Sequence, residues 1–228
     1  IANTSDTPGA VVLDNWWPTP QTVRIRRGCA LYAQPDQSAD CSSLMSYNDG
    51  SVEKLFAAIG GTIWDVTSAS APVAAVTGLT GGEWVSTQFA TDGGVFLIAV
   101  NGVDPVQLYD GTHWWPMTGS DILLLQLGTI TKDFAAGEVV TGATSGAKGS
   151  VIFQQGSQLY VTSTNATAFQ SGETASGSSG GSAVLSGASS TYWPGIAAAS
   201  GSSISAVNPS KFSFVWSYMA RLYFIESG

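Results

Sequence analysis

The sequence predicts an all-β fold, and three observations lead to that prediction. Its apolar segments are short and rich in Val, Ile, Phe, Tyr and Trp, which favour strands over helices. Gly, Ser and Thr interrupt the chain every few residues, so no long helical periodicity develops. Hydrophobic residues make up 44% of the 228 residues and charged residues only 11%, a balance that excludes an acidic or basic disordered chain.

Three segments repeat one pattern, in which an apolar strand is followed by a Gly turn and a second strand or the start of one. These segments are residues 55–65, 96–110 and 222–228. The first two begin 41 residues apart, at Leu55 and Phe96, and close on Asp65 and Asp110, which are 45 residues apart. A hairpin that repeats at this interval predicts β-propeller-like blades, each a four-stranded sheet of about 40–45 residues.

Each predicted blade is too thin to cover its own faces, so the blades must stack on one another. We expect large side chains to fill the space between them, and Trp64, Trp84 and Trp216 are suited to this role. Asp65 and Asp110 are expected to end their strands and to accept hydrogen bonds from nearby backbone amides. The third segment stops where a hairpin turn should lead to a partner strand, so we expect incomplete blades and a fold that continues.

Residues 129–190 predict a small all-β module inserted into the blades. The motif Phe-x-x-Gly-Glu-x-x-x-Gly-x-x-x-Gly begins at Phe134 and again at Phe169, a period of 35 residues. Between the two copies, residues 151–161 are expected to form two strands joined by a Gly turn. The repeat predicts a module with two pseudo-symmetric halves.

Composition divides the rest of the C-terminal half. Lys148 and Glu173 are the only charged residues between positions 139 and 210, which fits a packed interface and a soluble module of low charge equally well. Thirteen of the twenty residues from 171 to 190 are Ser or Gly, so this stretch is predicted to be a flexible loop or linker. The predicted organisation is a blade domain in residues 1–128, the inserted module in 129–190, a Ser-, Gly- and Ala-rich linker in 191–209, and a return to the blade domain in 210–228.

Few residues are suited to metal or cofactor chemistry. The chain has two cysteines, Cys29 and Cys41, and one histidine, His113, which are too few for a structural zinc site. The cysteines either form a disulfide or remain free buried thiols, and the sequence favours neither. No phosphate-binding glycine loop is present, and the longest apolar run, residues 95–100, is too short to span a bilayer. We therefore expect no metal, no cofactor and no membrane partner.

Enzymatic chemistry has little support in the sequence. A Ser-His-Asp relay would need His113, but no nucleophile-elbow motif accompanies it, and a turn or strand-end histidine beside Trp114 and Trp115 is the simpler interpretation. A pair of carboxylates could cleave a glycoside without any sequence signature, and the tryptophans could stack on sugars. The alternative is that the tryptophans fill the core. No catalytic residue is assigned, and the protein is predicted not to be an enzyme.

Four stretches carry motifs that are specific enough to compare with a known family: residues 12–28 (VLDNWWPTPQTVRIRRG), 52–58 (VEKLFAA), 100–111 (VNGVDPVQLYDG) and 215–226 (VWSYMARLYFIE). They resemble the tail nozzle, or packaged-DNA stabilisation, proteins of tailed bacteriophages. The resemblance covers roughly residues 9–120 and 210–228. The inserted module is similar to small β insertions found in many phage tail proteins.

The resemblance implies a structural virion protein of the phage tail with a β-propeller-bearing subunit. Such subunits assemble, usually as a hexameric ring, below the portal and adaptor of a short-tailed phage, where they extend the DNA channel, retain packaged DNA and let it pass at ejection. The implied partners are other copies of the chain, the tail adaptor and other tail proteins, and double-stranded DNA without sequence-specific contacts. The family pattern contains no catalytic residues, and the inserted module departs from it.

The charge balance is compatible with this implied role. Eight Lys and Arg against sixteen Asp and Glu leave a net charge of −8, the wrong sign for a nucleic-acid-binding domain. An acidic ring repels phosphates, so a duplex slides through it instead of binding. Arg24, Arg26 and Arg27 form the only basic cluster. They either contact an acidic neighbouring subunit or lie on a strand whose arginines face solvent and pair locally.

A second hypothesis is a carbohydrate-binding or carbohydrate-cleaving β-propeller that recognises a receptor. Its sugar-stacking platforms would be Trp16, Trp17, Trp114 and Trp115. Binding of a surface receptor by the inserted module is an intermediate hypothesis.

Overall fold

The computed structural model describes residues 16–18, 22–25, 30–36, 38–118, 120–192 and 209–227. These residues confirm the all-β fold, because strands form every regular element among them except one short 3-10 turn. The chain divides into two units, Ile1–Tyr32 and Ala33–Gly228. In the first unit, β1 (Trp16–Pro18) pairs with β2 (Val23–Ile25) as an antiparallel hairpin.

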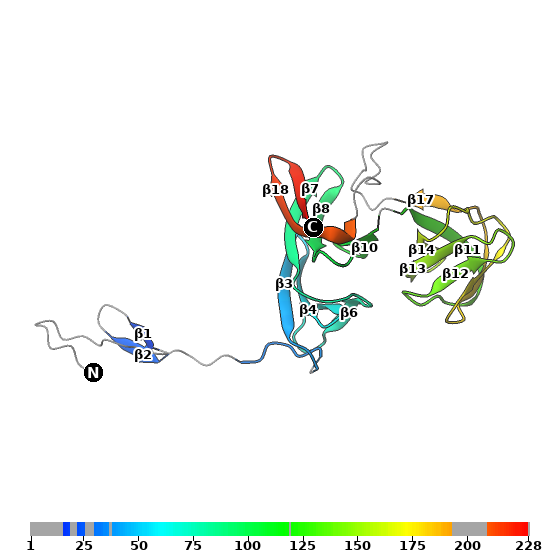
Figure 1. Ribbon diagram of the computed structural model, residues 1–228. Helices are drawn as coiled ribbons and strands as arrows, with labels where there is room; N and C mark the ends of the chain where they lie inside the picture. The colour runs from blue at the N-terminus through cyan, green and yellow to red at the C-terminus, as the bar shows by residue number, and fades with distance from the viewer. Residues whose placement is uncertain are drawn as a thin grey trace, which may run out of the picture. The chain divides into compact units, whose positions relative to one another are not determined.

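The second unit begins with two antiparallel sheets of four strands, here called blade 1 and blade 2 (Figure 1). Both follow chain order from one edge to the other. The repeated segments of the sequence therefore occupy the same strands of successive sheets, as predicted. Blade 1 contains β3 (Cys41–Asn48), β4 (Glu53–Ile59), β5 (Thr62–Asp65) and β6 (Val73–Val76), and blade 2 contains β7 (Val85–Thr91), β8 (Gly94–Val100), β9 (Val106–Tyr109) and β10 (Trp114–Met117).

Two aspartates end strands as the sequence predicts. Asp65 Oδ1 accepts a hydrogen bond from the Thr67 backbone N–H at 3.0 Å. Asp110 Oδ1 accepts the backbone N–H groups of Thr112 at 2.8 Å and His113 at 2.7 Å. These bonds satisfy amides that have left the strand ladder, so each carboxylate fixes the direction of the following turn.

Blade 2 is covered on both faces. Leu97 and Ala99 pack against blade 1 in a core that also contains Trp84, which fills the space between the blades as predicted. Phe96 and Ile98, which alternate with them along β8, belong to a second core on the opposite face. Because both faces of β8 are buried, the strand is apolar at nearly every position instead of alternating.

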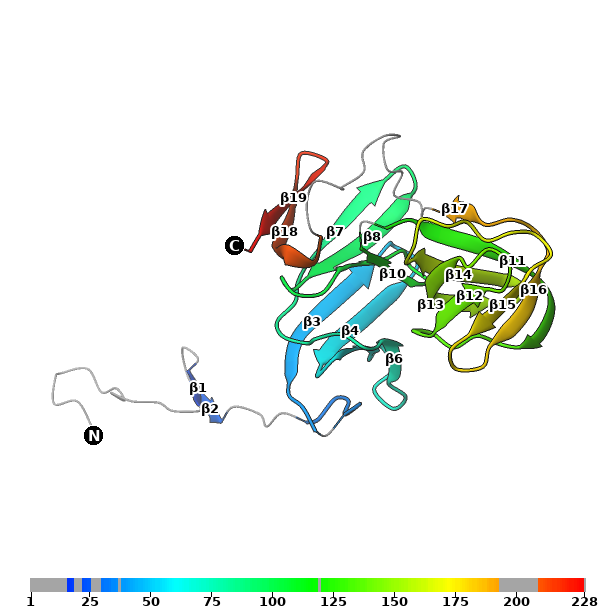
Figure 2. The same cartoon turned by 45° about the vertical axis from the view of Figure 1, so that its right-hand side comes forward.

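A C-terminal hairpin covers the second face of blade 2. The turn η2 (Pro209–Lys211) leads into β18 (Phe212–Tyr218), which pairs with β19 (Arg221–Glu226). β18 lies beside β7 in both views (Figure 1, Figure 2), and its buried side chains join the blade 2 core. The prediction that Trp216 fills a space between blades is wrong for the described chain, because Trp216 is on the opposite face of the hairpin and no described strand packs there. Closure of the blades into a propeller stays a prediction.

Between blade 2 and the hairpin, the chain forms a closed antiparallel β-barrel (Figure 2, green to orange). The order β14-β13-β12-β15-β16-β11 closes because β11 also pairs with β14, and β17 adds to β11 outside this ring. The barrel core is continuous and separate from the cores of the blades. The strands are β11 (Ile122–Lys132), β12 (Val139–Gly142), β13 (Lys148–Gln155), β14 (Gln158–Ser163), β15 (Thr174–Gly177), β16 (Ser182–Leu185) and β17 (Ser190–Tyr192).

The two sequence repeats give the barrel a pseudo-two-fold symmetry, as predicted. Exchanging β11, β12 and β13 with β14, β15 and β16 maps the pairing β12–β13 onto β15–β16 and β13–β14 onto β16–β11. The pairings β12–β15 and β11–β14 map onto themselves. The predicted hairpin in residues 151–161 is present as β13 and β14, which turn at Gly156 with a φ of 57°.

The repeated glutamate of the first motif copy explains the glycines of the second. Glu138 is buried, and its Oε1 accepts the Ala135 backbone N–H at 2.7 Å while its Oε2 accepts that of Ser179 at 2.8 Å in the other repeat. A Cβ atom at Gly177 or Gly181 would collide with this carboxylate. Both glycines are therefore required by the side chain that crosses the pseudo-two-fold axis.

The second glutamate makes the reciprocal crossing. Glu173 Oε1 accepts the Gln170 backbone N–H at 2.6 Å, and Oε2 accepts those of Thr144 at 3.0 Å and Ser145 at 2.9 Å in the first repeat. The Ser145 hydroxyl adds a bond of 2.8 Å to Oε1. Gly142 leaves space for this carboxylate as Gly177 does for the other. Each half of the barrel thus organises a turn of the other half.

The prediction of a flexible linker in residues 171–190 is wrong. This stretch contains β15, β16 and the first residue of β17. Its small residues are packing requirements, because Ala175 and Ala183 point into a narrow core and the glycines leave space for Glu138. A composition rule for linkers does not distinguish such residues from flexible ones.

The domain boundaries follow the strands. The barrel begins at Ile122 with β11, so the predicted boundary between residues 128 and 129 falls inside that strand. At the other end, β17 runs to Tyr192, two residues into the linker predicted for 191–209. Residues 193–208 of that linker lie outside the described residues.

Candidate functional site

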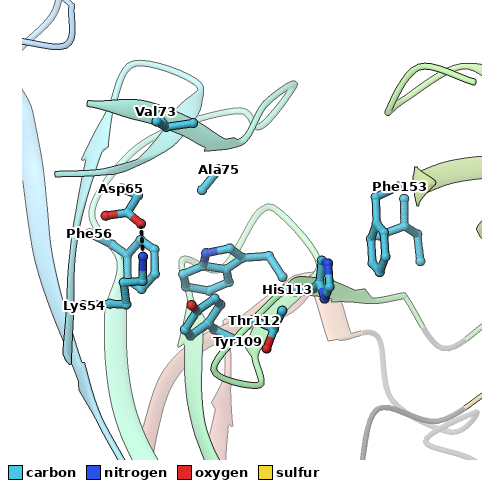
Figure 3. A pocket seen from close by; sticks show the side chains of 11 residues that line it. Lys54, Phe56, Asp65, Val73, Ala75, Tyr109, Thr112, His113 and Phe153 are labelled. Carbon is cyan, nitrogen blue, oxygen red and sulfur yellow. Dashed lines mark hydrogen bonds and ion pairs between the residues drawn. The ribbon is translucent and has the colours of Figure 1, made fainter. Parts of the chain in front are cut away.

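A pocket of about 300 Å³ opens where blade 1, blade 2 and the barrel meet (Figure 3). Lys54 and Asp65 lie at one end in that view, and His113 and Phe153 lie at the other. Its lining consists of Lys54, Phe56, Asp65, Val73 and Ala75 from blade 1, Tyr109, Thr112, His113 and Trp114 from blade 2 and the turn before β10, and Ile152 and Phe153 from the barrel.

The charged end of the pocket is an ion pair held by strand register. Phe56 pairs with Asp65 across β4 and β5, and Lys54 lies two residues before Phe56, so all three side chains share one face. Lys54 Nζ lies 2.8 Å from Asp65 Oδ2. Burial alone would raise the pKa of Asp65, but the bonds from Lys54 and Thr67 outweigh it and hold that pKa below its ordinary value. Asp65 is therefore ionised and oriented.

An aromatic cluster forms the adjoining wall. The Phe56 ring centroid lies 4.9 Å from those of both Tyr109 and Trp114, in edge-to-face arrangements. Tyr109 Oη donates a hydrogen bond to the Gly111 carbonyl at 2.8 Å. Burial, with the nearby charges of Asp65 and Asp110, raises the pKa of Tyr109 to about 12. The Tyr109 side chain is therefore uncharged at neutral pH, and its hydroxyl group is held in place.

The far end of the pocket is a stacked pair of rings. His113 and Phe153 lie with centroids 3.9 Å apart and planes 3° apart, which joins blade 2 to the barrel. Burial lowers the pKa of His113 by more than the negative charge of Asp110 raises it, so the imidazole is uncharged at neutral pH. Asp110 Oδ2 accepts the Trp115 indole N–H at 2.7 Å. Among the described residues the His113 ring makes no hydrogen bond to a carboxylate or a hydroxyl group, and it lies just before β10 as a strand-end histidine.

The pocket combines flat aromatic walls with one ammonium and one carboxylate. The ion pair can donate and accept hydrogen bonds with a small ligand that carries hydroxyl groups, whereas the Phe56, Tyr109 and Trp114 rings are at most 7% exposed and give the pocket an apolar wall without open stacking faces. The Trp114 indole N–H, which belongs to this lining, is buried without a hydrogen-bond partner in the described chain.

The tryptophans proposed as sugar platforms do not offer open faces. Trp114 and Trp115 are only 7% and 1% exposed, and both fill cores of blade 2, which confirms the core interpretation and overturns the platform prediction for these two. The structure places Trp16 and Trp17 in β1 and does not describe their side chains.

The predicted partner-binding arginines and the cysteines are only partly covered by the structure. Arg24 lies in β2 with its side chain outside the description, and Arg26 and Arg27 lie outside the described residues, as does Cys29. Cys41 is a free and exposed thiol at the start of β3, so the alternative of a buried free thiol does not hold for this residue.

No group of three or more His, Cys, Asp or Glu side chains that could hold a metal ion occurs in the described residues. Within the same residues, no helix has the length and apolarity needed to cross a membrane.

A second candidate surface is the face of the C-terminal hairpin that points away from blade 2, here called the outer hairpin face. Trp216 stacks on Tyr223 with centroids 5.3 Å apart and planes 16° apart, and Phe214 lies 6.0 Å from Trp216. Sequence reasoning missed this surface, although the apolar residues on both faces of β18 were a visible signal. Its exposed members are Phe214, Trp216, Tyr218, Tyr223 and Ile225, with Met219 at the hairpin tip.

Comparisons with protein-family models, with curated proteins and with solved structures find no match to this chain.

Proposed function

We propose that the protein is a structural subunit of a phage tail that acts by assembling into a ring and not by catalysing a reaction. In this proposal the ring extends the DNA channel below the portal and adaptor, retains packaged DNA and lets it pass at ejection. One observation supports it most: blade 2 is covered on both faces, whereas the outer hairpin face leaves several large apolar side chains in solvent. A contiguous exposed apolar surface of this kind marks an interaction site.

The resemblance of the blade segments to tail nozzle proteins is the basis for placing the protein in a phage tail. The charge of the chain supports a channel through which DNA passes. The net charge of −8 repels DNA phosphates, and the chain has few Lys and Arg side chains that could neutralise them. The ring is therefore expected to bind DNA weakly at physiological salt while enclosing it.

Electron microscopy of the full-length protein, alone and with its tail adaptor, tests the proposal. We expect annular particles that join the adaptor and a filter-binding assay that detects little affinity for free duplex DNA. A protein that remains monomeric and never joins the adaptor would overturn the structural role.

Carbohydrate binding is the second candidate, and the pocket is the observation that favours it. The Lys54–Asp65 pair offers hydrogen bonding beside an apolar wall of aromatic residues. Glycan-array binding that is lost in Lys54→Ala and Asp65→Asn but kept in Lys148→Ala, an exposed barrel lysine, would support it. Reducing-sugar release that disappears in Asp65→Asn would extend it to cleavage. No binding and no release from any glycan on the array would remove this candidate.

A further inference from the structure

The stacking of the blades follows one rule, which assigns each blade a front and a back face. The front face packs on the next blade along the chain, and the back face packs on the preceding one. Met45 and Phe56 on the front face of blade 1 share a core with Leu97 on the back face of blade 2. Phe96 on the front face of blade 2 shares a core with Val215 on the back face of the hairpin. Each contact joins a front face to a back face.

The outer hairpin face is the front face that this rule leaves uncovered. On the front face of blade 1, Met45 is the cross-strand partner of Phe56, and on that of blade 2, Phe89 is the partner of Phe96. The corresponding pair on the hairpin is Trp216 and Tyr223. The first two pairs lie in cores between blades, whereas Trp216 is 39% exposed. The outer hairpin face thus continues an interface that the chain already forms twice.

The same chain leaves part of a back face uncovered. Leu44 precedes Met45 in β3, so it points to the back of blade 1, where it is 65% exposed. Leu55 and Trp64 on this face are half-buried. Among the described residues, Val66 and the segment that contains Ala33 and Ala39 pack over the part of the face where Ala57 and Ile59 are buried. Among the described residues, one front face and one back face are therefore both without a partner blade.

We propose that the outer hairpin face of one copy packs on the back face of blade 1 of a second copy of this chain. The contact joins two different surfaces, so it is head-to-tail and generates a ring when the rotation closes. This inference rests on the proposed function, because it names the surfaces through which the proposed ring forms. The partner surface offers aliphatic side chains from Leu44 and Leu55 to the aromatic side chains of the hairpin.

Charge and turn geometry agree with this pairing. Arg221 lies on the same face as Tyr223, two residues along β19, and Glu53 lies on the same face as Leu55, two residues along β4, so the surfaces carry opposite charges. The hairpin turns through Met219 and Ala220, which have φ values of 48° and 56° where glycine or asparagine is the usual residue. The exposed Met219 extends the apolar surface at the tip with an adaptable side chain.

Two lysine substitutions test the contact in the full-length protein by sedimentation velocity and light scattering. Trp216→Lys breaks the outer hairpin face, and Leu44→Lys breaks the back face of blade 1. Each is expected to raise the dissociation constant of self-association by about 30-fold or more, as for a central hot-spot residue. Val184→Lys, at a similarly exposed apolar residue of the barrel, is the matched control and should assemble as the parent does.

Mixing the two variants provides the decisive measurement. Leu44→Lys retains the outer hairpin face and Trp216→Lys retains the back face, so an equimolar mixture should form dimers of one copy of each and nothing larger. A mixture that stays monomeric, or a Leu44→Lys variant that assembles normally, overturns the proposal, as expected if the hairpin pairs with itself, with other residues of its own chain or with a different protein. A ring that persists in both variants also overturns this interface but leaves the structural role standing. A mixed dimer that forms as expected but does not bind the adaptor would support this interface and overturn the structural role.

Discussion

The barrel closes its ring of strands on itself, whereas each blade leaves two faces open until another sheet covers them. Every residue of the barrel core comes from the barrel. The core between blade 1 and blade 2, in contrast, takes Phe56 and Ile63 from one sheet and Leu97 and Tyr109 from the other. The interior of the barrel is therefore built from the barrel alone, although Ile122 and Tyr160 on its outside join the core of blade 2.

This difference has a consequence for function. A closed barrel has few free strand edges, and few apolar side chains of this barrel are exposed, so it offers little surface for assembly. In the described part of the chain, the outer hairpin face is the face of the stacked sheets that no other sheet covers, and it is as apolar as the covered faces. The blades, not the barrel, are where we expect assembly to occur.

We expect the largest effect from replacing one core residue in each region. Phe169→Ala removes a buried ring from the barrel and is expected to lower the free energy of unfolding by about 3–5 kcal/mol. Phe56→Ala should cost a similar amount in the core between the blades. Hydrogen exchange read by mass spectrometry should show lost protection in barrel peptides for Phe169→Ala and in peptides of both blades for Phe56→Ala. Equal loss in both regions from either variant would mean that barrel and blades unfold as one unit.

The next effect concerns the crossing glutamates. Glu173→Gln places an amide N–H₂ against the N–H donors of Gln170, or of Thr144 and Ser145, whichever way it is oriented. We expect a loss of about 2–3 kcal/mol, the range for a charge-assisted buried hydrogen-bond set. Glu138→Gln should cost less, because fewer donors meet that carboxylate. Urea denaturation of both variants, with the exposed Glu226→Gln as control, measures the order.

Glu173 also predicts an acid limit for the barrel. Burial alone would raise the pKa of Glu173, but the donors from Gln170, Ser145 and Thr144 outweigh it and hold that pKa below its ordinary value. Because the unfolded chain takes up the proton first, this stabilisation is complete above about pH 4.3 and is lost as the pH falls through the folded pKa. Barrel peptides should lose exchange protection over that acid range, and Glu173→Gln should flatten the pH profile. An unchanged profile in the variant would assign the acid response to other carboxylates.

The sequence predicted the repeated features of both regions well, because repetition reveals what is structurally equivalent. The 41-residue interval identified successive blades, and the 35-residue interval identified the two halves of the barrel. Asp65 and Asp110 were correctly predicted to cap turns, since that chemistry is local.

Long-range features were missed for a physical reason. The Ser- and Gly-rich residues 171–190 form strands because Glu138, more than thirty residues away, occupies the space that their side chains would fill. The pocket combines Lys54, His113 and Phe153 from three parts of the chain that no sequence spacing connects. The exposure of Trp216 depends on which sheets pack around it, and its aromatic character alone indicated burial.

A smaller effect lies at the junction of the two regions. His113→Ala removes the stack on Phe153 and is expected to cost about 0.5–1.5 kcal/mol. Burial lowers the pKa of His113 in the fold, so the unfolded chain binds the proton first and stability falls as the pH drops below about 6.5. His113→Phe should keep the stack and remove this part of the pH dependence. Urea midpoints at pH 7.5 and pH 5.5 compare the variants, and a histidine-independent drop would contradict this assignment.

The smallest effect is expected from the ion pair inside the pocket. Lys54 and Asp65 are about a quarter exposed, so water screens their attraction and Lys54→Met should cost only about 0.2–1 kcal/mol. The same change should raise the pKa of Asp65 toward its ordinary value, because one of the interactions that hold it low is gone. An NMR titration of the Asp65 carboxyl measures this shift even where the change in stability is too small to detect. If the pKa of Asp65 does not move, Thr67 alone orients the carboxylate. The Lys54 ammonium group of the parent protein would then be free to bind a ligand in the pocket.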